Sequence, residues 1–154
     1  MRTLRLVLGD QLDLQHAWFA RPDPEVRYVL MEVRQETDYV LHHAQKILAI
    51  FAAMRAFARQ LRAAGHTVDY LAIDDPANRQ SLPGNLDALI ARHRIEHFEY
   101  QAPDEWRLDR QLADYAAGLA IPAQAVDSEH FFTRRDEAAA FFGTRQRWTM
   151  EPFY

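Results

Sequence analysis

Three residues with potential binding chemistry follow the first apolar run of the chain, residues 4–8. Gly9 lets the backbone turn tightly or approach a ligand closely, and Asp10 and Gln11 would present an acceptor and an amide at the end of a strand. A simple turn in which Asp10 caps the next segment explains the same residues, and from spacing alone it is the plainer interpretation. The phosphate-loop patterns GxGxxG and GxxxxGK[ST] are absent, so this is not a phosphate loop.

Charged residues alternate after the second apolar run. Glu32, Arg34 and Glu36 would share one side as long as the chain stays extended. A buried carboxylate needs hydrogen-bond donors, and the NH and OH groups of a polar heterocycle are suitable ones. A surface ion pair between Arg34 and a glutamate, which would contribute little to stability, is the alternative. The residues themselves leave both interpretations open.

A long helix is predicted from Thr37, as its N-cap, to Ala64. Tyr39 lies in its first turn with His42 and His43 close behind. Adjacent helical residues point about 100° apart, so the two histidines are not placed to chelate one metal ion. Asp38, His42 and Lys46 are spaced four residues apart and would share one face of this helix. That face either carries solvent-exposed ion pairs or lines a ligand-binding crevice. His43 falls near the apolar stripe and is predicted to be a core histidine.

Catalytic and metal-binding patterns are not legible in the sequence. There is no cysteine, no HxxxH or HxH spacing and no GxSxG motif. Disulfides, thiolate zinc sites and cysteine nucleophiles are therefore excluded within these residues. We predict neither a catalytic residue nor a metal site for this chain.

The elements that would position these residues alternate between strand and helix. Apolar runs rich in β-branched and aromatic residues predict five strands, at residues 4–8, 26–33, 68–73, 95–100 and 121–126. Beside the long helix, further helices are predicted from 81 or 85 to 93, after 104, and from a capping box at 133, with a short one within 13–24. This predicts an α/β, Rossmann-like fold with a five-stranded, mainly parallel sheet and helices on both faces. Ligands of such sheets bind at the carboxyl ends of the strands, where the polar residues above are found.

Composition fits one α/β domain, which we place at residues 1–144. With 154 residues and a net charge of -4, the chain is too acidic to bind nucleic acid mainly through phosphates. No apolar run reaches the roughly 18 residues that a membrane span needs, so we expect no membrane association and a cytoplasmic protein. Residues 145–154, with Trp148, Phe153 and Tyr154, predict the start of a linker, unless these aromatic side chains dock back onto the domain.

Four segments of the chain form a distinctive combination: LGDQL at 8–12, MEVRQETDYVLHHAQKI at 31–47, AMRAFA at 53–58 and WTMEPFY at 148–154. Together they resemble the bacterial photolyase-related family, the iron–sulfur bacterial cryptochromes and (6-4) photolyases. In that family the amino-terminal α/β domain holds an antenna chromophore, 6,7-dimethyl-8-ribityllumazine. A helical carboxy-terminal domain holds FAD and a four-cysteine [4Fe–4S] cluster, and it binds damaged DNA.

The resemblance implies that this chain is the antenna-type domain, which passes excitation to FAD in a DNA-repairing lyase, and that catalysis lies outside it. It implies as partners the helical FAD domain and, through the parent protein, damaged DNA. The residues that it places around the lumazine are Gly9, Asp10, Gln11, Glu32, Glu36, Tyr39 and His42. A stand-alone nucleotide-binding or interaction domain of the same fold, without catalysis, is the alternative.

Overall fold

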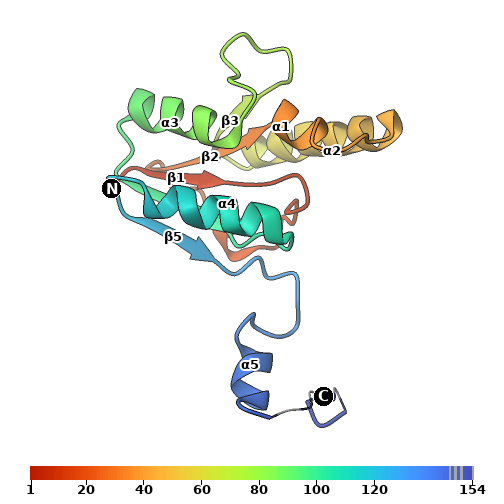
Figure 1. Cartoon of the computed structure of the whole chain (residues 1–154). Helices are drawn as coiled ribbons and strands as arrows, with labels where there is room; N and C mark the ends of the chain where they lie inside the picture. Colours follow the sequence, from red (N-terminus) through yellow and green to blue (C-terminus); the bar gives the residue numbers. More distant parts are fainter. Residues whose placement is uncertain (146, 148, 150, 154) are drawn as a thin grey trace.

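The chain, analysed as a computed structural model, forms one five-stranded sheet in the order β3-β2-β1-β4-β5, and every strand pair is parallel (Figure 1). The structure describes all residues except Gln146, Trp148, Met150 and Tyr154. The strands are β1 (Thr3–Leu6), β2 (Val26–Met31), β3 (Thr67–Leu71), β4 (His97–Gln101) and β5 (Ala123–Val126). The predicted Rossmann-like α/β fold is confirmed, and the order reverses between β1 and β4.

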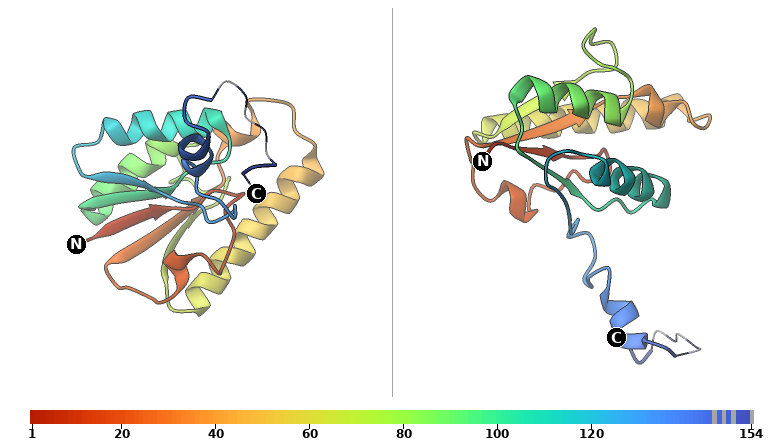
Figure 2. Two further views of the ribbon diagram at one scale, coloured as in Figure 1. Left: turned by 90° about the horizontal axis from the view of Figure 1, so that it is seen from below. Right: turned by 60° about the vertical axis from the view of Figure 1, so that its left-hand side comes forward.

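Helices cover both faces of this sheet (Figures 1 and 2). The helical elements are η1 (Ala17–Phe19), α1 (Arg34–Thr37), α2 (Ala44–Ala63), α3 (Leu82–His93), α4 (Trp106–Ala117) and α5 (Glu137–Phe142). On one face, Leu4 and Leu6 of β1 pack with leucines of α3 and α4. On the other face, Val7 and Leu30 pack with α2 and η1. Because successive side chains of a strand point to opposite faces of the sheet, the strands contribute residues to two separate apolar cores.

The long helix begins later than the sequence predicts. Thr37 ends the short α1 instead of capping α2, and the side chain of His43 caps α2 by accepting from the amide of Gln45. His43 is exposed, so its prediction as a core histidine is wrong. Val40, which the apolar period assigned to the buried face, is 49% exposed. Residues 38–43 form a turn here, and Asp38, His42 and Lys46 do not share one helix.

Other helix boundaries agree better with the sequence. Ser81 caps α3 by accepting from the amide of Gly84. Gly65 follows α2 with a φ of 92°, a conformation that favours glycine. The capping box predicted at Thr133 is wrong, because α5 starts at Glu137 after Asp136.

The last helix stands apart from the layered body. Residues 127–136 lead from β5 to α5, which Figures 1 and 2 show away from the sheet. The ring of Phe153 contacts Phe141 and Phe142 of α5. Trp148 and Tyr154, which the linker prediction also used, lie outside the described residues, and the domain boundary at residue 144 stays a prediction. Among the residues that the structure describes, no helix is long and apolar enough to cross a membrane.

Candidate functional site

A cavity of about 340 Å³ lies at the carboxyl ends of β1 and β2, close to the point where the strand order reverses. Parallel α/β sheets bind their ligands at this position. The strand ends form its floor, α2 forms one wall, and the first turns of α3 and α4 close the other side. The lining residues are Leu6, Val7, Leu8, Gly9, Asp10, Met31, Val33, Glu36, Thr37, Tyr39, His42, Lys46, Ile47, Ile50, Phe51, Met54, Leu82, Glu105 and Leu108.

Gly9 brings the backbone of the first strand end close to α2. A Cβ atom built on Gly9 would lie 3.0 Å from Cγ2 of Ile50 and 3.2 Å from Sδ of Met54. Both neighbours line the cavity, so any larger residue would press into its wall. The sequence interpretation of Gly9 as a close-approach residue is therefore consistent with its surroundings.

Asp10 lies beside Gly9, and its carboxyl keeps contact with solvent while protein atoms crowd it. This desolvation raises the pKa of Asp10 above its ordinary value, and the negative charges of Asp104 and Glu105 add to the effect. No hydrogen bond or ion pair found among the described residues joins Asp10 to an arginine or a lysine, although the charge interaction with His130 has an opposing effect and lowers the pKa of Asp10. Its carboxylate is thus the cavity acceptor that would gain most from a hydroxyl or NH donor.

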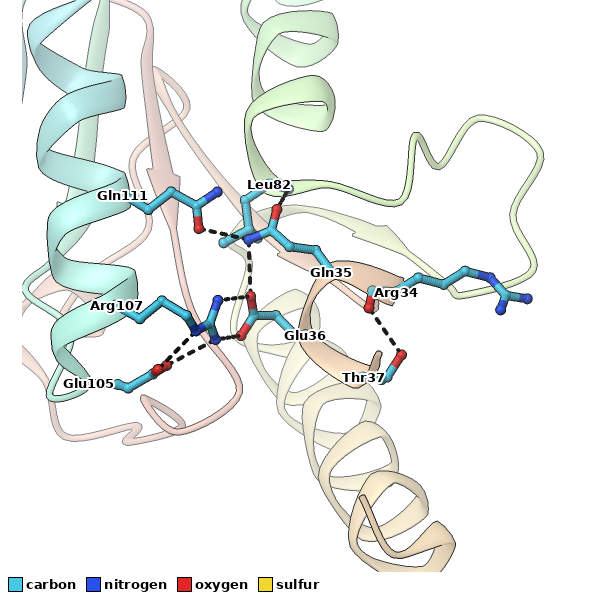
Figure 3. Close-up of polar contacts among 8 residues, drawn as sticks. All are labelled: Arg34, Gln35, Glu36, Thr37, Leu82, Glu105, Arg107 and Gln111. Carbon is cyan, nitrogen blue, oxygen red and sulfur yellow. Dashed lines mark hydrogen bonds and ion pairs between the residues drawn. The ribbon is translucent and has the colours of Figure 1, made fainter. Parts of the chain in front are cut away.

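Glu36 is held in place from two sides (Figure 3). Arg107 of α4 donates to both of its carboxylate oxygens, at 3.2 Å and 2.8 Å, and Gln35 donates to Oε1 at 3.0 Å. Arg107 also donates to both oxygens of Glu105, at 2.9 Å and 3.1 Å. Gln35 accepts in turn from the amide of Leu82, the first residue of α3. The network thereby joins α1, α3 and α4 at the edge of the cavity.

Aromatic side chains continue this network along the turn between α1 and α2. The guanidinium of Arg107 lies 4.2 Å from the ring centre of Tyr39, a cation–π contact. The Tyr39 ring meets the His42 ring edge to face at 5.1 Å between centres. Tyr39 and His42 both line the cavity.

Gln11, predicted as a binding residue, lies away from the cavity lining. Its side chain is 1% exposed. It accepts from the amide of Leu8 at 3.0 Å and donates to the carbonyl of Gln101 at 3.1 Å. Gln11 ties the end of β1 to the end of β4, so its amide supports the strand ends.

Glu32, also predicted as a binding residue, is fully buried and its hydrogen bonds are met within the protein. It accepts from Arg55 at 2.6 Å and 2.8 Å, from the hydroxyl of Tyr70 at 2.5 Å and from the amide of Ile73 at 2.8 Å. Burial by itself would raise the pKa of Glu32, but these hydrogen bonds outweigh it and lower the pKa. Glu32 is thus an internal anchor of β2 and β3 and is not among the residues around the cavity.

Comparison with known proteins identifies the family of this chain. The family model described as deoxyribodipyrimidine photo-lyase-related protein matches residues 5–154. The chain belongs to this family. It is also 35% identical to a protein named (6-4) photolyase from Agrobacterium fabrum (strain C58 / ATCC 33970) over 155 residues. That match covers the whole chain but only 31% of the relative, its N-terminal part.

The cavity of this photolyase-related chain combines apolar walls with a polar rim. Ile47, Ile50 and Met54 of α2 offer aliphatic contact, and the rim carries the carboxylates of Asp10, Glu36 and Glu105. Pockets for small molecules span about 300–1,000 Å³ and carry a few polar groups on mostly apolar walls. Such a cavity suits a small ligand that has both apolar surface and hydrogen-bond donors.

Sequence reasoning missed the contribution of α4 to this site. Arg107 lies 71 residues from Glu36 along the chain, and no local pattern links the two. One signal was present, namely an arginine in the first turn of a helix, where the helix dipole disfavours a positive charge. Residues placed against local preference are often retained for a tertiary or functional contact.

Proposed function

We propose that this chain is the antenna-type domain of a photolyase-related protein and that it binds a light-harvesting chromophore of the 6,7-dimethyl-8-ribityllumazine type. The observation that carries the proposal is the cavity at the carboxyl ends of β1 and β2, where Gly9, Asp10, Glu36, Tyr39 and His42 come together. Family membership supports the same reading, because the matched relative is named a photolyase.

The residues present fit the donors and acceptors of such a ligand. Ile47 and Ile50 offer apolar surface to a flat ring system, and Tyr39 offers an aromatic face. Asp10 would accept from hydroxyl groups of the ribityl chain, because its carboxylate is partly desolvated and no arginine or lysine pairs with it among the described residues. Glu36 is already engaged by Arg107 and Gln35, so it supplies a fixed acceptor with fewer free lone pairs.

The chain's own residues would hold, orient and shield the ligand. When bound, the lumazine would supply light absorption and pass its excitation to FAD in the remaining part of the protein. FAD, the [4Fe–4S] cluster, the lyase reaction on damaged DNA and the helical partner domain all belong to that remaining part in this proposal. This division agrees with the chain spanning about a third of the photolyase that it matches.

A fluorescence titration of the protein with 6,7-dimethyl-8-ribityllumazine tests the proposal. We expect saturable binding at one site per chain and a higher melting temperature at saturating ligand. Absence of binding by folded protein would contradict the chromophore assignment. A nucleotide is the other ligand class considered for this fold, and the carboxylates of Asp10, Glu36 and Glu105 at the rim disfavour its phosphates. Stabilisation by ATP or NAD in place of the lumazine would reverse that choice.

A further inference from the structure

Residues 38–43 form the part of the cavity wall that has the least support from the sheet. They connect α1 to α2 without regular structure, and Tyr39, Val40 and Leu41 are 49%, 49% and 103% exposed. Tyr39 and His42 of this turn nevertheless line the cavity. Something outside the turn must therefore fix these two side chains if the wall is to keep one shape for a ligand.

Arg107 of α4 contacts this turn through the ring of Tyr39. Its guanidinium lies 4.2 Å from the Tyr39 ring centre, and Tyr39 passes the contact on to His42. The same guanidinium is itself immobilised by Glu36 and Glu105, which accept from its nitrogen atoms at 2.8–3.2 Å. A planar cation held on two edges presents its face to the ring in one orientation.

The position of Arg107 in its helix is an independent sign that this contact is retained for a tertiary purpose. It lies in the first turn of α4, where the helix dipole favours anions. Glu36 and Glu105 offset that cost, and hydrogen bonding to Glu36, the largest influence, raises the pKa of Arg107 above its ordinary value. Of the two carboxylates that bind Arg107, Glu105 is two residues away and Glu36 is 71 residues away. The ion pair with Glu36 therefore joins α4 to α1.

We propose that Arg107 is a positioning residue for the chromophore cavity: by stacking on Tyr39 and clamping Glu36, it orders the turn at residues 38–43 as the cavity wall. Arg107 does not line the cavity itself and acts through Tyr39 and Glu36. The proposal rests on the proposed function for its effect on ligand binding, whereas the ordering of the turn is a property of the free protein.

The test compares Arg107→Met with the same substitution at a matched arginine, Arg5, whose side-chain partners do not line the cavity. Arg5 also pairs with a carboxylate, Glu99 at 2.6 Å, and lies over an aromatic ring, that of Trp18 at 4.9 Å, but it is absent from the cavity lining. Arg107→Met should weaken lumazine binding by about tenfold, the loss that a partly exposed cation–π contact together with its ion pair represents. Arg5→Met should lower the melting temperature and leave the affinity of the folded protein within about twofold of the unchanged chain.

A second variant and a second measurement separate positioning from general stability. Arg107→Lys keeps the charge but loses the planar face and the double clamp, so it should recover only part of the affinity. Amide hydrogen exchange of the free protein should be faster at residues 38–43 in Arg107→Met and unchanged there in Arg5→Met. An Arg107→Met protein that binds the lumazine as tightly as the unchanged chain, or whose turn exchanges no faster, would overturn the proposal.

The two proposals fail in different ways. If the unsubstituted protein binds no lumazine, the proposed function is wrong, and the exchange data alone decide the role of Arg107: faster exchange at the turn supports ordering, and equal exchange overturns it. If the unsubstituted protein binds but Arg107→Met binds equally well, the cavity assignment stands and the positioning role is wrong.

Discussion

Two clusters of glutamate, arginine and tyrosine lie at the carboxyl ends of the same sheet and differ in what surrounds them. In the first, the buried cluster, Glu32 is fully buried and meets Arg55 and Tyr70. In the second, the cavity cluster, Glu36 is partly exposed and meets Arg107, which stacks on Tyr39. The same three residue types therefore serve two purposes.

Saturation of the carboxylate distinguishes the two clusters. Glu32 accepts from four nitrogen or hydroxyl donors inside the protein, which leaves its oxygens no capacity for a ligand. Glu36 lies on the cavity wall and accepts from three donors, which leaves part of its hydrogen-bonding capacity unused. A carboxylate at a strand end thus indicates a ligand site only when the protein itself leaves part of its hydrogen-bonding capacity unused.

The largest expected effect is on stability, at the buried cluster. Glu32→Gln removes the negative charge that accepts hydrogen bonds from Arg55, Tyr70 and the amide of Ile73. The free energy of unfolding should therefore fall by about 3 kcal/mol. Lumazine affinity of the folded fraction should stay within about threefold. Urea denaturation and fluorescence titration measure the two quantities. A stable Glu32→Gln protein that has lost the ligand would place Glu32 in the binding site after all.

The reciprocal substitution should reverse this pattern. Glu36→Gln removes a partly exposed ion pair, so the free energy of unfolding should change by less than about 1 kcal/mol. Lumazine affinity should fall by about tenfold, because Arg107 loses one of its two anchors and the cavity loses an acceptor. The same denaturation and titration experiments apply. A large loss of stability with unchanged affinity would erase the distinction between the clusters.

A substitution at Gly9 tests the cavity wall formed by Ile50 and Met54 of α2, two residues that belong to neither cluster. Gly9→Ala places a methyl group 3.0 Å from Ile50 and 3.2 Å from Met54, so these two side chains must give way by a few tenths of an ångström. We expect affinity to fall several-fold and stability to drop by about 1 kcal/mol. Gly118→Ala is the control, because a Cβ there would meet only backbone oxygens at 3.6–3.7 Å. Equal affinities for the two variants would exclude a tight ligand fit beside Gly9.

The smallest effect concerns Asp10 and the pH. Because folding raises the pKa of Asp10, its ionised form destabilises the folded chain at neutral pH, and this penalty disappears as the pH falls through the folded pKa. Asp10→Asn should therefore be slightly more stable than the unchanged chain at pH 7 and equal to it in acid. Thermal melts across that pH range measure the difference. A less stable Asp10→Asn protein at pH 7 would show that Asp10 is stabilised by a partner.

The sequence contained most of the fold, because strands and helices of this class follow apolar periodicity. The five runs all became strands, and Ser81 and Gly65 mark helix ends where expected. The turn at residues 38–43 was missed because Val40 continues the apolar period of the helix although it is 49% exposed. An apolar period predicts which side chains would share a face, but it does not show whether another element packs against that face.

The site was predictable only in part, for a related reason. The strand-end rule brought Gly9, Asp10 and Glu36 to one edge. Alternation along an extended chain grouped Glu32 with Glu36, but the chain turns into α1 at Arg34, and the two carboxylates part. Arg55 and Arg107 decide the role of each glutamate, and both reach it through tertiary contacts that no local pattern records.

The most direct test of the central claim is a lumazine titration of three proteins side by side: the unchanged chain, Glu36→Gln and Glu32→Gln, each confirmed as folded by circular dichroism. The account predicts one saturable site in the unchanged chain, about tenfold weaker binding in Glu36→Gln, and near-unchanged binding in Glu32→Gln. No saturable binding by the unchanged chain, or equal loss of affinity in both variants, would contradict it.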